Sequence, residues 1–267
     1  MIKIDYQNWN DYRAALAGID PAASIGGSDR SWCGTASVGE ALEIADKGWA
    51  EGMDRVRTIS LPTVDAMSMA PAEGGWAFDV TGADYDVGDY LAGTPECWLT
   101  PDATTQKPVI TIAANIVSSA GIPASALELR GAAIVALTLA LQTSGYVVRV
   151  YAVEGMSIGQ DIWHRVELTD PNGGPLDTDR LLFALAHPSA ARQLGYALGA
   201  SLAGKNPNYC GIGWPSGGPS AMPPAEWKTD LYLAGSYLDS ANWKSPESVS
   251  AWVAETYKAL SEGRSIN

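Results

Sequence analysis

A thiol, an imidazole and several carboxylates are the residues of this sequence whose types could do chemistry. Cys33 lies shortly before a helix expected to begin after Ser37, and the amide dipoles at a helix N-terminus favour a thiolate. His164 lies on a predicted strand and could act as the base for this thiol. The carboxylate that orients the imidazole could come from Asp179, or from Asp170 or Asp177. Together these residues define a candidate cysteine nucleophile.

The order and spacing of this set are loosely similar to those of papain-like and transglutaminase-like enzymes. Cys33 has no second cysteine or diagnostic tryptophan after it, and His164 lacks the glycine-rich surroundings usual in those families. We therefore expect no catalytic residue and interpret Cys33 as a small buried side chain. A hydrolase that uses Cys33, His164 and Asp179 is the alternative. His187 precedes a proline at a helix junction and is expected to cap a helix end.

The strongest secondary-structure signals lie in a central segment that would organise the fold. The run from Val109 to Ile116 is apolar and rich in β-branched residues, which predicts a buried strand. A helix is expected next, with Ser125 and Glu128 as a capping box and Gly145 at its C-terminal end. The run from Val147 to Val153 predicts a second strand, and a helical connection places two such strands parallel in one sheet.

This strand, loop, helix and strand resemble the core of the von Willebrand factor A fold. In that family the first strand ends in Asp-x-Ser-x-Ser, and these side chains hold a divalent metal. Here Asn115 stands at the aspartate position, Val117 at the first serine and Ser119 at the second. Without the carboxylate most of the attraction for a hard cation is lost, so the resemblance implies a metal-free relative. A metal-dependent adhesion module that uses Asn115 and Ser119 is the alternative.

The chain as a whole is predicted to be an α/β protein with a mostly parallel, helix-covered sheet of the von Willebrand A or Rossmann type. Residues 1–60 are expected to form a helical N-terminal region, residues 61–107 an irregular linker and residues 108–267 the α/β core. The loop from Asn115 to Ala124 lacks the glycines of a dinucleotide site and the lysine of a phosphate loop. We therefore expect no cofactor.

Composition limits the classes of partner. The chain has 267 residues, 46% of them apolar, and its 30 acidic and 17 basic residues give a net charge of −13. This charge opposes binding to nucleic acid or to an anionic membrane. Three cysteines without a close pair favour a reducing compartment, and the N-terminus lacks a signal-peptide pattern. The expectation is a soluble, intracellular protein.

Aromatic residues in predicted loops are the candidate anchors for a protein partner or for self-association. Ten tryptophans are present, and aromatic side chains dominate the binding energy of many protein interfaces. The predicted binding residues are Trp98, Trp214 and Trp227, together with Ser118 and Ser119 at the rim of the central loop.

Four phrases resemble an uncharacterised family encoded by bacteriophages and related mobile elements. The phrases are GTASVGEALEIADKGWAEG (34–52), VGDYLAGTPECWL (87–99), RGAAIVALTLALQTSGY (130–146) and LDTDRLLFALAHPSAAR (176–192). This resemblance implies a phage or prophage origin and a domain of unknown function. The expected role is therefore that of a phage-encoded, non-catalytic binding or assembly protein in the host cytoplasm or in the virion.

Overall fold

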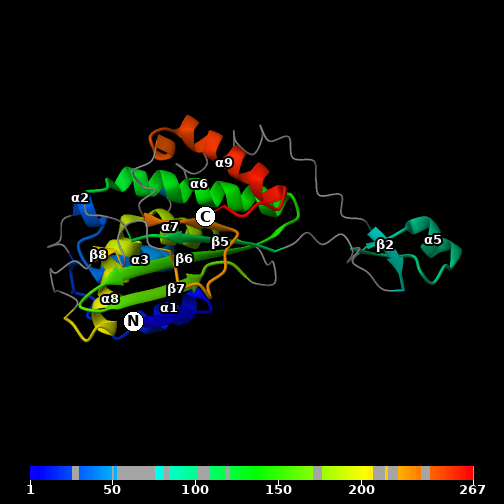
Figure 1. Cartoon of the computed structure of the whole chain (residues 1–267). Coiled ribbons are helices and arrows are strands. Elements are labelled where there is room, and N and C mark those ends of the chain that lie inside the picture. The colour runs from blue at the N-terminus through cyan, green and yellow to red at the C-terminus, as the bar shows by residue number, and fades with distance from the viewer. Residues whose placement is uncertain are drawn as a thin grey trace.

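Two parallel strands, β5 and β6, and the helix α6 between them form the centre of the fold (Figure 1). β5 spans Val109–Asn115, α6 spans Ala124–Thr143 and β6 spans Val147–Ser157. The predicted strand, helix and parallel strand are thus confirmed. The computed structural model describes residues 1–25, 30–49, 51–52, 76–80, 84–101, 109–117, 121–170, 176–206, 214–215, 222–235 and 241–266.

The main sheet has the strand order β1-β7-β6-β5-β9. β7 (Asp161–Glu167) runs antiparallel to β6, and β1 (Ile2–Tyr6) pairs in parallel with β7. On the other side β9 (Leu231–Leu233) pairs in parallel with β5, and the short β8 (Trp214–Pro215) pairs with the end of β6. The predicted α/β class with a mostly parallel sheet packed against helices is confirmed.

Local capping signals set the ends of several helices. The side chains of Ser37, Asp177 and Ser245 each accept a backbone hydrogen bond at the start of α3, α7 and α9, as their positions in the sequence predict. Besides α6, the helices that accompany the main sheet are α1 (Trp9–Leu16), α2 (Arg30–Cys33), α3 (Val38–Lys47), α7 (Thr178–Ala186), the π-helix η3 (Ala190–Gly195), α8 (Tyr196–Leu202), the 3-10 helix η5 (Ala241–Trp243) and α9 (Pro246–Ser261).

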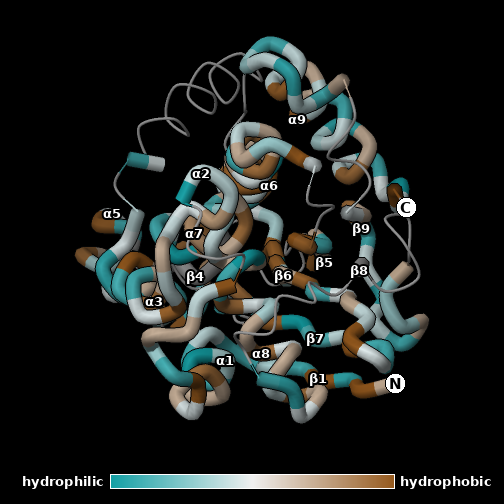
Figure 2. The backbone as a smooth tube through the Cα atoms, turned by 90° about the vertical axis from the view of Figure 1, so that its left-hand side faces the viewer, coloured by the Kyte–Doolittle hydropathy of each residue, from teal (hydrophilic) through white to brown (hydrophobic). Residues whose placement is uncertain are grey.

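The two faces of the main sheet have different covers. Alternate residues of β5 and β6, such as Ile112 and Val150, pack with the helices in a large apolar core. Figure 2 shows hydrophobic segments gathered where β5, β6 and α7 meet. On the opposite face Tyr151 and Trp163 pack with Trp227 and Tyr232 in a smaller aromatic cluster. Polar side chains on the helix-covered face are therefore enclosed by the protein.

Helix α6 is apolar on nearly all sides because other elements surround it. It is the one described helix long and apolar enough to cross a membrane, but 72% of that window is buried in the fold. α6 packs against α7 and α9, and a methyl group on Gly131 would overlap Ala186 of α7. The predicted Ser125 cap is wrong, since the N-cap residue is Pro123 and makes no side-chain hydrogen bond.

The N-terminal region predicted over residues 1–60 differs from the structure at its start. Residues Ile2–Tyr6 form β1 at the edge of the main sheet, where their burial alternates along the strand. Helix α1 and helix α3 contribute Leu16, Val38 and Ala41 to the same core as β5 and β6. The residues of β1, α1 and α3 therefore belong to the α/β core and are not a separate helical piece.

A second, smaller sheet lies within residues 61–107, where the sequence predicts an irregular linker. Its strands have the order β2-β4-β3, and in Figure 1 it forms a unit apart from the main sheet. Short strands such as these carry little periodicity, which explains why the residue pattern does not predict them. The elements are β2 (Trp76–Asp79), β3 (Asp84–Tyr85), α5 (Val87–Ala92) and β4 (Trp98–Pro101).

Candidate functional site

A carboxyl group and an imidazole face each other inside the main sheet. Glu154 on β6 lies opposite His164 on the antiparallel strand β7. Both side chains are buried, with exposures of 2% and 1%. Glu154 Oε2 lies 3.5 Å from His164 Nε2, which is longer than an ordinary hydrogen bond. Neither atom has a hydrogen-bond partner among the described residues.

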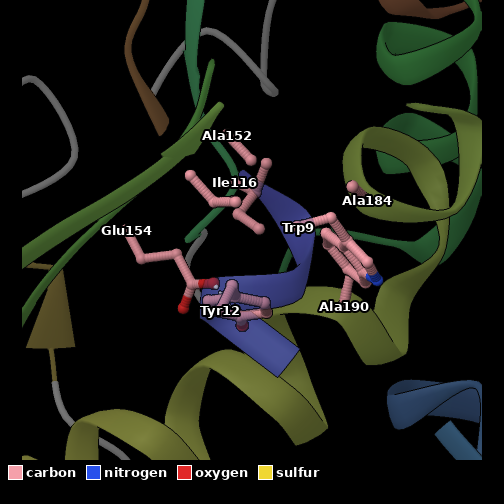
Figure 3. Close-up of a pocket in the computed structure, with 8 residues that line it drawn as sticks. Trp9, Tyr12, Ile116, Ala152, Glu154, Ala184 and Ala190 are labelled. Carbon is pink, nitrogen blue, oxygen red and sulfur yellow. Dashed lines mark hydrogen bonds between the residues drawn. The ribbon is translucent and has the colours of Figure 1, made fainter. Parts of the chain in front are cut away.

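Helix α1 closes this pair from the core side. The Tyr12 hydroxyl donates to Glu154 Oε1 at 3.2 Å, and Figure 3 shows the Glu154 carboxyl group directed toward Tyr12. The Tyr12 ring also stacks on His164, with ring centres 6.1 Å apart, and Tyr6 meets the same imidazole edge-on. β1 and α1 therefore supply an aromatic wall around the polar pair.

The π-helix η3 approaches Glu154 so closely that only glycine fits there. A methyl group on Gly195 would overlap the Glu154 carboxylate. π-Helical turns are rare and often occur at functional sites, because they widen a helix locally. Here the wide turn brings backbone against the carboxyl group and leaves no room for a ligand on that side.

Burial favours the neutral form of both members of the pair. Loss of solvent raises the pKa of Glu154 well above its ordinary value, although the hydrogen bond from Tyr12 opposes this change. Burial lowers the pKa of His164 to about 3. The imidazole is therefore neutral at pH 7, and burial favours the protonated form of the carboxyl group that faces it.

The space beside Glu154 is too small for a substrate. The cavity measures about 10 Å³ and is lined by the rings of Trp9 and Tyr12, with Ile116 and Ala152 on the sheet side. A volume of this size is about what one water molecule needs. The space beside the Glu154 carboxyl group therefore has room for about one water and cannot admit a larger reactant.

A separate cleft of about 290 Å³ opens on the other side of Trp9, whose side chain lines both spaces. Its acidic groups already have partners. Arg149 makes two hydrogen bonds to Glu167, at 2.7 and 2.6 Å. Asp177 caps α7 and lies 3.2 Å from Arg180. This cleft is polar, but its paired charges leave no evident set of metal or substrate ligands among the described residues.

The residues proposed for a cysteine nucleophile each contact a different part of the protein. The fully buried thiol of Cys33 donates to the Ile25 carbonyl at 3.1 Å. His164 instead contacts the Glu154 cluster, and no described contact joins it to Cys33. Asp179 lies in the first turn of α7, next to Gly48. His187 is the C-cap residue of α7, as the sequence predicts.

The proposed metal position has a buried amide in place of a carboxylate. Asn115 is 1% exposed, and its Oδ1 accepts from the Val117 amide at 3.1 Å. Its side chain also forms a hydrogen bond with Tyr232. Ser118 and Ser119 lie outside the described residues. Among the residues that are described, no cluster of three His, Cys, Asp or Glu side chains could hold a metal ion.

The predicted aromatic anchors differ in exposure. Trp227 is only 8% exposed, and the Arg165 guanidinium lies 4.8 Å above its ring. It covers the second face of the sheet, which corrects the prediction that it anchors a partner. Trp98 is half-buried in β4. Trp214 pairs with Ser157 through its backbone, and its side chain lies outside the described part.

Sequence reasoning missed Glu154 as a site residue. The predicted strand ends at Val153, so Glu154 stands just after it in the sequence, whereas β6 extends to Ser157 and buries Glu154. Tyr12 carries no sequence signal for this role, since it lies 142 residues from Glu154 along the chain.

No curated protein sequence and no solved structure matches the chain. A family model described as "Domain of unknown function (DUF7192)" matches residues 1–261, so the chain belongs to this family.

Proposed function

We propose that this protein is a non-catalytic binding or assembly protein that docks onto another protein through its small sheet. We call residues 76–101 the acidic-apolar unit. It consists of β2, β3, β4 and α5. The main observation that supports this proposal is the concentration of exposed apolar side chains in this unit. Large apolar side chains exposed together are typical of protein interaction sites.

The exposed side chains lie on β2, on the residue after it and on α5. Leu91 is 79% exposed, and Val87 is 60% exposed. Of the eight large apolar side chains that are exposed in the described part of the chain, five belong to this unit: Phe78, Val80, Val87, Tyr90 and Leu91. Half-buried Trp98 on β4 lies in the same small sheet, in agreement with its predicted binding role.

Charge indicates what kind of partner would fit. The unit has no lysine, arginine or histidine, and its acidic residues are Asp79, Asp84, Asp86, Asp89 and Glu96. An apolar patch with acidic neighbours is complementary to a basic protein surface with an apolar centre. Two copies of the unit would repel each other, so self-association through it is disfavoured.

The buried pair on the main sheet gives a catalytic role little support. Its carboxyl group and imidazole are buried, burial favours the neutral form of each, and the adjoining cavity holds about one water. Among the described residues, the contacts of His164 do not include Cys33. A binding role needs none of these groups to meet a substrate.

The sequence resemblances extend the proposal. The phage-like phrases support an origin in a phage or prophage, and a partner in the host cytoplasm or in an assembling virion. The β5-α6-β6 unit supports a von Willebrand A-like core that would work without a metal. Both remain parts of the proposal.

A photocrosslinking experiment tests the docking surface. Benzoylphenylalanine is placed at Tyr90 or, as the matched control, at Met222, which are 55% and 56% exposed. Crosslinking is done in the cells that produce the protein, and the captured protein is then purified and titrated. We expect an adduct only from position 90, a basic captured protein, and binding that weakens with added salt.

Substitutions at the same two surfaces complete the test. Leu91→Asp is expected to weaken binding of the purified partner at least tenfold, while Met222→Asp leaves it unchanged. Neither side chain lies in the core, so both variants keep the melting temperature of the wild type. Equal binding by the two variants, or equal adducts from positions 90 and 222, would reject the proposal.

A further inference from the structure

A fully buried arginine on α6 has no hydrogen-bond partner in the described part of the chain. Arg130 has an exposure of 0%. Its Nε, Nη1 and Nη2 atoms make no hydrogen bond with any described residue. Arginine carries five N–H donors and stays protonated in proteins, so this side chain presents a complete set of donors and a positive charge inside the fold.

The second buried arginine has carbonyl acceptors for both of its terminal nitrogens. Arg192 donates to the carbonyl oxygens of Trp32 and Ile122, at 2.8 and 2.7 Å, and its guanidinium lies 4.7 Å above the Trp32 ring. Arg130 has no comparable acceptors among the residues that the structure describes. Burial lowers its pKa to about 10, which still leaves it charged at pH 7.

An uncompensated charge of this kind is unfavourable. Moving a charged side chain out of water costs several kcal/mol unless an opposite charge or acceptors replace the water. An anion with several acceptor atoms would therefore compensate the buried charge of Arg130. Carboxylates and phosphates meet the fork geometry of guanidinium best.

The position of Arg130 is one where α/β folds bind ligands. From β5 the chain passes through α6 to β6 on one side, whereas β9 pairs with β5 on the other side. In open α/β sheets ligands bind at the carboxyl ends of the strands. Helical side chains lean toward the helix N-terminus, so Arg130 extends from the second turn of α6 toward this edge.

Other polar groups gather at the same edge. Tyr232 on β9 lies within electrostatic range of Arg130, and its side chain also bonds to Asn115 at the end of β5. The N-cap residue of α6, Pro123, makes no side-chain hydrogen bond, and a helix N-terminus attracts negative charge. The arginine, the tyrosine and the helix end thus favour the same sign of ligand.

We propose that the buried guanidinium of Arg130 forms an anion-binding site near the carboxyl ends of β5 and β9, where it holds the carboxylate or phosphate group of a small ligand. Tyr232 assists from the neighbouring strand, and the α6 dipole adds to the attraction. The site is separate from the acidic-apolar unit and from the Glu154 pair. It can therefore be tested independently of the proposed docking function.

Thermal unfolding of the full chain in different sodium salts tests the site. Inorganic phosphate and acetate are the probes, and chloride at equal ionic strength is the reference. We expect the wild-type melting temperature to rise with phosphate or acetate relative to chloride, by about 4 °C at saturating anion. A rise with phosphate alone assigns a phosphate group, and a rise with acetate alone assigns a carboxylate.

Variants connect the shift to the residue. Arg130→Met removes the charge at similar volume and should abolish the anion-dependent rise, while melting in chloride is unchanged or higher. Arg264→Met removes an exposed arginine and should keep the full rise. Tyr232→Phe should raise the phosphate or acetate concentration that gives the half-maximal shift about tenfold, which is the effect of one lost hydrogen bond to a charged group.

The proposal fails if the wild-type protein melts at the same temperature in all three salts. It also fails if Arg130→Met keeps the anion-dependent rise. An Arg130→Met variant that does not fold in chloride would show that protein contacts already compensate the arginine, and this result would overturn the proposal as well.

Discussion

Glu154 and His164 occupy directly opposite positions on the antiparallel strands β6 and β7, with Oε2 and Nε2 3.5 Å apart. Their pKa values move in opposite directions, since burial raises that of Glu154 and lowers that of His164. Both shifts favour the neutral form, as expected for two groups that lose water together. The pair therefore links stability to pH on two sides of neutrality.

On the alkaline side, Glu154 should make stability fall as pH rises. The folded protein keeps the Glu154 proton to a higher pH than the unfolded chain, which loses it near pH 4.5. Above pH 6.5, where His164 is neutral in both states, the unfolding free energy should keep falling, by at most about 1.4 kcal/mol per pH unit, until the folded protein also loses this proton. Urea titrations from pH 6.5 to 8.5 measure this slope. Glu154→Gln keeps an acceptor for Tyr12 and should abolish this contribution; an unchanged slope in this variant would contradict the assignment.

On the acidic side, His164 should make stability fall as pH falls. The unfolded chain binds a proton on this histidine near pH 6.5, while the folded protein does so only near pH 3. Between pH 6.5 and 4.5 the Glu154 effect runs the opposite way, so the wild type should show a plateau. Below pH 4.5 the His164 contribution remains alone, at about 1.4 kcal/mol per pH unit.

A His164→Gln variant tests the acidic side. It cannot gain this proton and should lose less stability between pH 4.5 and pH 3.5 than the wild type does. The two proteins are compared by urea unfolding at each pH, and parallel curves would show that His164 is not the group that titrates.

Much of the fold could be predicted because its signals are local. β9 and α7, for example, carry signals in their own residues, since a short apolar run marks one and the Asp177 cap begins the other. β1 was missed because five alternating residues near the N-terminus carry a weak signal, and their partner strand β7 lies about 160 residues away. The return of β7 beside β6 also depends on a turn at Gly159, whose φ is 74°.

The candidate sites were harder to predict than the fold because their residues lie far apart along the chain. Arg130 stands at the start of an otherwise apolar run, and this contradiction of pattern is readable in the sequence, whereas Glu154 lies one residue beyond the predicted strand. The residues that surround Glu154 and Arg130 could not be read from the sequence in this way. Tyr12, His164 and Tyr232 come from other elements and meet these residues only through the sheet topology. Cys33, in contrast, attracted attention by its type, although its thiol is buried.

The buried state of Cys33 predicts slow modification of its thiol. The side chain has an exposure of 0%, and its Sγ donates to the Ile25 carbonyl. A Cys33 nucleophile would instead be accessible and react quickly, because thiolate character and exposure control reactivity. Iodoacetamide labelling followed by peptide mass spectrometry should modify Cys33 in the urea-unfolded chain and leave it at least tenfold less modified in the folded protein. Equal labelling in both states would restore the thiol-enzyme alternative.

Gly195 should be intolerant of a side chain because η3 packs directly on Glu154. A methyl group at this position would overlap the carboxylate, so Gly195→Ala must displace either the helix or Glu154. We expect a loss of about 1 to 3 kcal/mol in unfolding free energy, the usual effect of overpacking a core. Gly18→Ala is the matched control, since a methyl group there would meet no described atom within 4 Å, and it should change stability little. In the Glu154→Ala background the same Gly195→Ala change should be much less destabilising, because the overlapping group is gone. An additive double variant would show that the strain at Gly195 does not come from Glu154.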